Sequence, residues 1–275
     1  MDTSKKIKLT GEFNASQLHT IAEGLEEGLT EKQLELYSKS EFDAKQMEEI
    51  LWGYKTNLTE SQIYVYAKPE FDAYQMSELR WALEEGLGIE QVAKIANPEF
   101  YAEHIRALAY AFKEALNDEQ TQFLLENIFD EEETEQVILG FKHGLTIEQV
   151  NMYALPKECN AYHMDEIRMG IEHKLSIEEV KLYADPEKYN YLQMKELRTG
   201  LEAGLSIEQV SNYSNPEFNA EQMLQIRCAL MNSCLCQEQI EFICDPMFSD
   251  VIMSELRFAF ENEMTIDEVK EKYHL

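Results

Sequence analysis

The sequence predicts an all-α protein, an α-solenoid of nine two-helix repeats that form a single repeat domain over residues 1–275. The first observation is a motif that recurs at intervals of 29 or 30 residues, which is typical of repeat architectures. The second is a helical spacing of apolar residues inside each copy. The third is composition, because 11 Gly and 6 Pro argue against a loop-rich or sheet-rich protein.

Each repeat is expected to begin with a helix of about 13 residues. The repeats start near residues 13, 42, 71, 100, 129, 159, 189, 218 and 248. An Asn or Asp usually follows the leading residue and Gln comes three residues later, as in Asp72 and Gln75; this pair predicts a helix start with a capping box. Counting the leading residue as zero, apolar residues occupy positions five, eight and twelve, for example Met76, Leu79 and Leu83.

Position eleven of this first helix is always Gly or Ala. Glycine inside a helix costs about 1 kcal/mol relative to Ala. We therefore expect another helix to approach closely at this position.

A second, shorter helix follows in each repeat. Its start is predicted by a second capping box, as in Thr30 with Gln33 or Ser176 with Glu179. Proline is expected to stop it, at Pro69, Pro98, Pro156, Pro186 and Pro216. Neither helix can bury its apolar stripe alone, so neighbouring repeats must stack into a continuous core.

The repeat pattern weakens in the middle of the chain. The fourth repeat ends without a proline, and the fifth begins with the acidic run Asp130, Glu131, Glu132 and Glu133. One interpretation is a hinge near residues 126–135. The other is a solvated helix start, where acidic side chains favour the helix N-terminus. The run is also the densest negative patch that a basic partner could contact.

The formal net charge is −29, from 53 Asp and Glu against 24 Lys and Arg. Such a surface repels nucleic acid and anionic membranes and favours a basic partner, although solubility alone could also explain it. The start of the chain lacks the apolar run of a signal peptide, and no stretch has the roughly 18 apolar residues of a membrane span. With five cysteines, an odd number, we expect free thiols and a cytoplasmic protein.

The motif F-[ND]-A-x-Q-M-x-x-I-R-x-G-L, seen in FNAEQMLQIR, together with YADPE, resembles short helical repeats of uncharacterised proteins from gut bacteria and their mobile elements. The resemblance covers nearly the full chain. It implies a repeat fold but no established activity and no functional residues. The layout also looks loosely like tetratricopeptide and HEAT solenoids, and by analogy such repeats bind proteins.

Position ten of the first helix is the candidate binding site. Trp52, Trp81 and Tyr110 occupy it in repeats two to four, on the side of the helix opposite the apolar stripe. Equivalent positions form a row in stacked repeats, and binding surfaces use aromatic rows as anchors. The alternative is packing between successive first helices, and it is the preferred interpretation of the row as a whole.

Position nine carries a row of arginines. We call Arg80, Arg168, Arg198, Arg227 and Arg257 the arginine row. The preferred interpretation is a network that links adjacent repeats, and the alternative is a clamp for a partner's carboxylates or phosphates.

The sequence names no catalytic or metal-binding residues. Cys228, Cys234, Cys236 and Cys244 are close together but lack paired C-x-x-C knuckles, so ordinary thiols are expected. No nucleophile elbow, phosphate loop or dinucleotide fingerprint occurs. We therefore expect a non-enzymatic protein without a cofactor that binds a basic protein partner. The alternative is an acidic mimic of nucleic acid that inhibits a host-defence nuclease, as an anti-defence protein of a phage or mobile element would.

Overall fold

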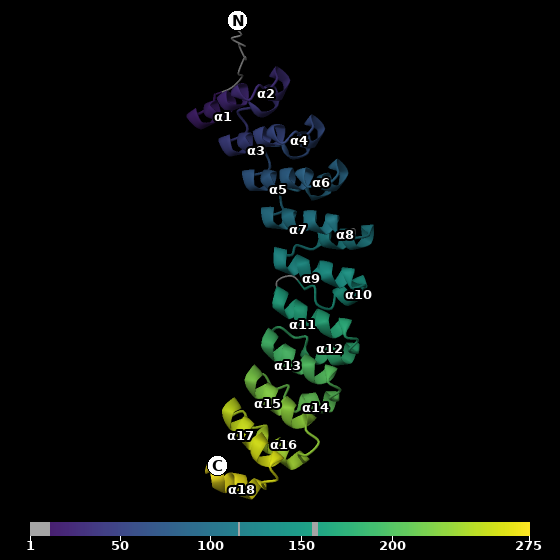
Figure 1. The fold of residues 1–275 in the computed structure, drawn as a ribbon. Helices are drawn as coiled ribbons and strands as arrows, with labels where there is room; N and C mark the ends of the chain where they lie inside the picture. Colours follow the sequence, from purple (N-terminus) through teal and green to yellow (C-terminus); the bar gives the residue numbers. More distant parts are fainter. Residues whose placement is uncertain (1–11, 115, 156–158) are drawn as a thin grey trace. The chain divides into compact units, whose positions relative to one another are not determined.

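The computed structural model describes residues 12–114, 116–155 and 159–275. The N-terminal lysines and Pro156, the expected helix stop in the fifth repeat, lie outside these residues. The described residues form 18 α-helices and contain no strand (Figure 1). The all-α class and the α-solenoid of helical repeats are therefore confirmed.

Helices alternate between the first and second member of each repeat. The first helices have 12 residues each: α1 (Ala15–Glu26), α3 (Ala44–Lys55), α5 (Ala73–Glu84), α7 (Ala102–Lys113), α9 (Glu131–Lys142), α11 (Ala161–Glu172), α13 (Tyr191–Glu202), α15 (Ala220–Met231) and α17 (Asp250–Glu261). The second helices are shorter: α2 (Glu31–Tyr37), α4 (Glu60–Tyr66), α6 (Ile89–Ile95), α8 (Asp118–Glu126), α10 (Ile147–Val150), α12 (Ile177–Tyr183), α14 (Ile207–Ser211), α16 (Gln237–Ile243) and α18 (Ile266–Tyr273).

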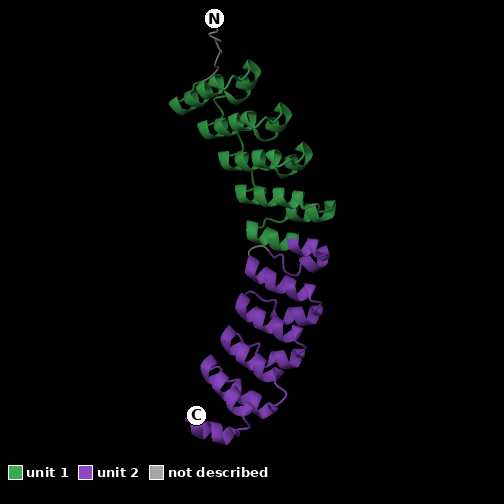
Figure 2. Cartoon of the chain, viewed as in Figure 1, with its two compact units in different colours: residues 1–138 green, residues 139–275 purple. Residues whose placement is uncertain are grey.

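The chain divides into two compact units, residues 1–138 and residues 139–275 (Figure 2). In unit 1 the first helices α1, α3, α5 and α7 pack in succession, and α4 packs against α6. In unit 2 the first helices α11, α13, α15 and α17 do the same. The boundary lies inside α9, and the hinge near residues 126–135 stays a prediction.

The predicted apolar positions form the core. Met76, Leu79 and Leu83 are all buried on α5. The leading aromatic of most repeats is buried as well, for example Phe71 at 1% exposure and Phe218 at 2%. Each repeat thus hides its stripe against its own second helix and the neighbouring repeat.

A buried glutamine at position four links consecutive repeats. On α5, the Gln75 Oε1 accepts the backbone N–H of Asp72 at 2.8 Å, which completes the capping box. The Gln75 Nε2 donates to the backbone carbonyl of Phe100, the leading residue of the next repeat, at 2.6 Å. One side chain therefore fixes both its own helix start and the position of the following repeat.

The same arrangement recurs in five repeats, at distances of 2.5–2.7 Å to the next leading carbonyl. We call these side chains the capping glutamines: Gln17, Gln46, Gln75, Gln193 and Gln222. Each is 6% exposed. Burial without hydrogen bonds would be costly for an amide, and here the side chain uses both its oxygen and its nitrogen.

Glycine at position eleven makes room for a tyrosine of the second helix. A Cβ added to Gly170 would lie 1.9 Å from the Tyr183 Oη, and Tyr183 is fully buried. The same pairing occurs in four other repeats: Gly24 with Tyr37, Gly53 with Tyr66, Gly140 with Tyr153 and Gly200 with Tyr213. The close helix approach predicted from these glycines is therefore confirmed.

Two repeats with alanine at position eleven carry a smaller side chain at the equivalent place of the second helix. Ala82 is followed by Ile95, and Ala111 by Leu124, at the place where other repeats have Tyr. All four of these side chains are buried. The two positions thus change together, small with large or medium with medium, and the total volume is preserved.

This volume match predicts the effect of changing both positions. Gly170→Ala should lower the free energy of unfolding by about 1–3 kcal/mol, because the overlap with Tyr183 outweighs the gain in helix propensity. Tyr183→Ile alone should also destabilise, since it leaves a cavity. The double variant should recover at least half of the summed loss in urea denaturation. Additive losses would show that the two side chains do not compete for one space.

Candidate functional site

Three aromatic side chains lie at position ten of consecutive first helices in unit 1. We call Trp52 on α3, Trp81 on α5 and Tyr110 on α7 the aromatic row. Trp52 is 52% exposed and Tyr110 is 44% exposed, while Trp81 is partly buried. The helices that carry them pack side by side. None of the three side chains is needed to fill the core, since positions five, eight and twelve supply it.

Trp81 is held in place by the next repeat. Its ring centroid lies 5.1 Å from that of Tyr110, with the planes tilted by 57°. The Arg106 guanidinium and the Lys113 ammonium lie 5.9 and 5.7 Å from the Trp81 ring centroid. Trp81 therefore packs between repeats and still presents part of its surface, so both interpretations of position ten describe part of its environment.

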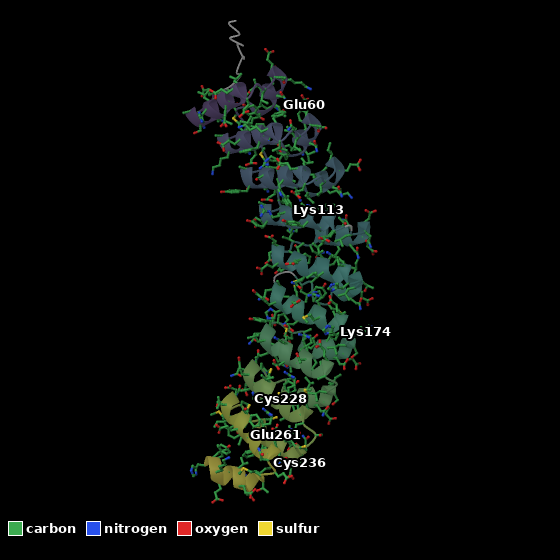
Figure 3. All side chains as sticks on the ribbon, viewed as in Figure 1. Glu60, Lys113, Lys174, Cys228, Cys236 and Glu261 are labelled. Atoms are coloured by element: carbon green, nitrogen blue, oxygen red, sulfur yellow. The ribbon has the colours of Figure 1, made fainter. Side chains whose placement is uncertain are left out.

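The cations beside the row are paired with carboxylates. Lys113, labelled in Figure 3, donates to Glu85 at 2.6 Å. Arg106 makes two hydrogen bonds to Glu78, at 2.7 and 2.8 Å. These exposed pairs contribute little to stability. Their effect is to keep the cations over the Trp81 ring, which orients the indole.

Position ten is different in unit 2. The residues there are Leu139, Met169, Thr199, Cys228 and Phe258. Phe258 is exposed, at 53%, and the other four are partly buried. Aromatic residues at position ten of consecutive repeats therefore occur in repeats two to four, and Phe258 stands alone in the ninth repeat.

The acidic run lies at the start of α9. Asp130 Oδ1 accepts the backbone N–H of Glu133 at 2.8 Å, and the Glu133 carboxylate accepts the N–H of Asp130 at 3.1 Å. Partial burial raises the pKa of Glu133 above the usual carboxylate value. Glu131 and Glu132 are exposed. The run thus divides into two residues that cap a helix and two that face solvent.

Three members of the arginine row link neighbouring repeats, while Arg168 pairs with Asp165 and Glu172 of its own helix. Arg198 Nε donates to Glu166 of the preceding repeat at 2.8 Å, and both side chains are buried. Arg80 pairs with Glu49 and Arg227 with Glu196 in the same way, both at 2.9 Å. This geometry supports the interpretation of a network between repeats, because the guanidinium groups are directed at carboxylates of their own chain.

Arg257 departs from this pattern. The residue at the acceptor position is Gln225, whose Oε1 lies 3.5 Å from Arg257 Nη2. Arg257 Nε is buried without a hydrogen-bond partner. The last repeat is therefore held by a weaker version of the contact.

Gln225→Glu should supply the missing carboxylate. We expect the free energy of unfolding to rise by about 0.5–1 kcal/mol, as for a partly exposed ion pair, despite the added negative charge. Urea denaturation measures the change, and the same substitution in an Arg257→Gln background serves as the control. A gain that persists without Arg257 would show that the pair is not its source.

His104 replaces the capping glutamine in the fourth repeat. It is 2% exposed, and its Nδ1–H donates to the Phe129 carbonyl at 3.0 Å. Its Nε2 is buried without a partner. Burial lowers the pKa of His104 below the ordinary value of 6.5, and the hydrogen bond to Phe129 only partly opposes this shift.

His104→Gln should raise the free energy of unfolding by about 1 kcal/mol at pH 7.5, because Gln can bond both the cap and Phe129. The difference in the free energy of unfolding between the variant and the parent protein should increase as the pH falls through 6.5. The reason is that the unfolded His104 binds a proton more tightly than the folded one. Urea denaturation at pH 7.5 and 5.5 measures both effects.

His19, exposed on α1, provides the matched control. His19→Gln should change the free energy of unfolding by less than about 0.5 kcal/mol at pH 7.5, as for other exposed positions. If His104→Gln and the parent protein differed in the free energy of unfolding by the same amount at both pH values, the result would contradict a buried, neutral His104 imidazole.

Two exposed tyrosines near the aromatic row were not identified as candidates from the sequence. Tyr74 lies on α5, seven residues before Trp81 and therefore on the same side of the helix. Tyr101 stands at the helix-cap position of α7. Two sequence signals could have identified them. Tyr74 lies seven residues before Trp81, and Tyr101 is an aromatic residue at a position where other repeats have Asn, Asp or Ser.

Other candidate chemistry is sparse in the part of the chain that the structure describes. No group of three or more His, Cys, Asp or Glu is arranged to hold a metal ion there. Cys228 and Cys236 (Figure 3) are free thiols, as are Cys234 and Cys244. Among the described helices, none combines the length and apolar character that crossing a membrane requires.

Comparison with protein-family models, curated protein sequences and solved structures gives no match for this chain. The site is therefore defined by the geometry of its own residues.

Proposed function

We propose that this chain is a non-enzymatic, cytoplasmic helical-repeat protein that binds another protein. The central contact is the aromatic row of unit 1. The observation that carries the proposal is the placement of three aromatic side chains at one repeat position on packed neighbouring helices, with Trp52 and Tyr110 about half exposed. Aromatic side chains of this kind supply most of the affinity in protein interfaces.

The charge of the chain favours a basic partner. The net charge of −29 attracts cationic surfaces over distances of about 10 Å at moderate salt. In this proposal the acidic surface steers the encounter, and the exposed Glu131 and Glu132 of α9 contribute to it. The aromatic row then provides the short-range contact.

Replacing Trp52 and Trp81 with Ala tests this proposal. The partner is first isolated from the native host by affinity capture, and its affinity for purified variants is then measured by calorimetry. We expect binding to weaken by roughly 2 kcal/mol or more, about thirty-fold. The loss of folding stability should stay near 1 kcal/mol, because Trp52 is exposed and Trp81 is only partly buried.

Phe258→Ala is the matched control, since Phe258 is exposed at the same repeat position in unit 2. It should leave the affinity unchanged. Equal losses for Phe258→Ala and the Trp pair, or no loss for the Trp pair, would contradict the aromatic row as the site.

A second candidate function is mimicry of nucleic acid by a phage or mobile-element protein that inhibits a defence nuclease. One observation favours it: the second helix of each repeat carries at least one acidic side chain in its first turn, from Glu31 in α2 to Asp267 in α18. A favourable interaction with the helix dipole is a structural reason for the same placement. The two candidates differ in the same experiment, because a mimic would lose affinity steeply with salt and would tolerate loss of Trp52 and Trp81.

A further inference from the structure

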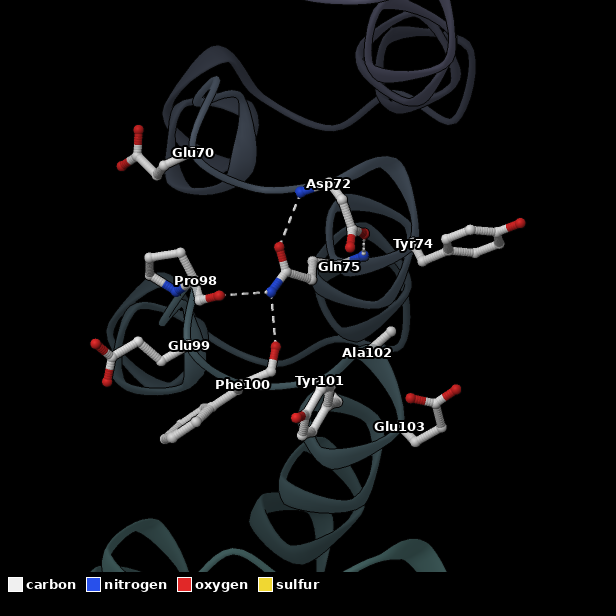
Figure 4. Close-up of a pocket in the computed structure, with 10 residues that line it drawn as sticks. All are labelled: Glu70, Asp72, Tyr74, Gln75, Pro98, Glu99, Phe100, Tyr101, Ala102 and Glu103. Carbon is white, nitrogen blue, oxygen red and sulfur yellow. Dashed lines mark hydrogen bonds between the residues drawn. The ribbon is translucent and has the colours of Figure 1, made fainter.

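A pocket of about 490 Å³ lies between the N-terminal ends of α5 and α7 in unit 1 (Figure 4). Its rim carries two tyrosines, Tyr74 and Tyr101, which are 71% and 72% exposed. Four carboxylates also line it: Glu70, Asp72, Glu99 and Glu103. The ten lining residues, all within the described part of the chain, include no Lys, Arg or His. We call this site the tyrosine pocket.

Three of these carboxylates make no hydrogen bond or ion pair within the described part of the chain. Asp72 caps α5 by accepting the N–H of Gln75. The side chains of Glu70, Glu99 and Glu103 are exposed and form no hydrogen bond or ion pair with the residues that the structure describes. They are therefore available to a ligand.

The repeat fold does not require Glu70, Asp72, Tyr74 or Tyr101, whereas Glu99 and Glu103 recur in the eighth repeat as Glu217 and Glu221. At the junction of the seventh and eighth repeats, the Gln193 Nε2 donates to Pro216 at 3.1 Å and to Phe218 at 2.6 Å. In the tyrosine pocket, Gln75 makes the same bonds to Pro98 and Phe100, at 3.0 and 2.6 Å. The backbone arrangement is shared, but the side chains differ. Lys188, Asn190, Leu192 and Asn219 stand in place of Glu70, Asp72, Tyr74 and Tyr101.

Tyr101 is present at a cost to its own helix. It occupies the N-cap position of α7 and makes no side-chain capping bond. Asn, Asp or Ser caps the other first helices that have a described N-cap: Asn14, Asp43, Asp72, Asn160, Asn190, Asn219 and Ser249. Replacing such a cap by a residue that cannot accept a hydrogen bond weakens a helix. Residues that break a local rule of the fold are typical of functional sites.

The chemistry of the pocket suits a guanidinium group. A planar cation can stack on the face of a tyrosine ring, and arginine also donates paired hydrogen bonds to carboxylates. Tyr74 and Trp81 lie on the same side of α5, so the pocket adjoins the aromatic row. Tyr74 lies seven residues before Trp81, about 10 Å along the axis of α5. A partner segment that covers Trp81 can therefore place one of its side chains against Tyr74.

We propose that the tyrosine pocket binds an arginine side chain of the basic partner. This inference rests on the proposed function, because it names the part of the partner that the same surface recognises. The aromatic row supplies the apolar contact, and Tyr74, Tyr101 and the three free carboxylates select a cation beside it.

A short peptide tests the pocket without the partner. The probe is acetyl-Gly-Arg-Gly-amide, titrated into the full-length ¹⁵N-labelled protein, with the neutral citrulline analogue as its matched control. We expect amide shifts centred on Tyr101 and Glu103 and an affinity about tenfold higher for the arginine peptide, as for a charge-assisted contact. Equal binding of both peptides, or shifts centred elsewhere, would overturn the proposal.

Carboxylate variants separate the pocket from the general charge of the chain. Glu99→Gln with Glu103→Gln should weaken the arginine peptide about tenfold. Glu217→Gln with Glu221→Gln removes the same two charges at the equivalent positions of the eighth repeat, and it should have less than a twofold effect. Similar losses for both pairs would show non-specific attraction only.

Tyr101→Asn gives the sharpest result. It should raise the melting temperature by about 2–4 °C, because it installs a helix cap, and it should weaken the arginine peptide several-fold. A stabilised variant with unchanged peptide affinity would remove Tyr101 from the site. Trp52 does not line the tyrosine pocket, so the peptide assay is independent of the aromatic row. If the arginine peptide does not bind, only the proposal for the tyrosine pocket is overturned. A failure of the Trp pair to affect partner binding overturns the proposed function alone.

Discussion

The hydrogen bond from a buried glutamine to the first carbonyl of the next repeat is the constraint on which this structure depends. A capping box alone would start each helix, but it would leave the next repeat free to rotate or slide. The capping glutamine uses its oxygen for the cap and its nitrogen for the neighbour, so the start of one helix determines where the next repeat begins. The bonds of 2.5–2.7 Å occur in the same geometry at five junctions between repeats.

The other inter-helix contacts follow from that register. Where a capping glutamine fixes the start of a repeat, Tyr66 reaches the surface of α3 at Gly53, and Arg80 reaches back to Glu49. Neither contact lies within one helical turn. Both need the second helix, or the neighbouring repeat, to return to the same place each time. The repeat is thus a set of mutually dependent distances and not a string of independent helices.

Much of this could be predicted from the sequence, because the signals are local. The caps at Asp72 and Thr30, the core stripe of Met76 and Leu79, and the helix periods depend on residues within four positions of each other. The outward direction of Trp81 follows from the same helical geometry. Its contact with Tyr110, 29 positions away, matches the predicted packing between successive first helices, but the distance and angle of the two rings depend on how the repeats are rotated. The tyrosine pocket was missed for a related reason: Tyr74 and Tyr101 belong to different repeats and line one pocket only after the repeats stack.

The fourth repeat has a consequence for how the chain opens. There Tyr101 leaves the helix cap empty, and His104 makes one bond where a capping glutamine makes at least two. In a nearest-neighbour description of repeat stability, the interface between the fourth and fifth repeats contributes the least stabilisation in unit 1. Fluctuations that separate repeats are therefore expected to begin at this interface. Amide protons of α7 and α8 should then exchange by a partial opening that leaves α3 and α5 closed. The aromatic row borders this segment, so a partner bound to the row would also slow the partial opening of α7 and α8.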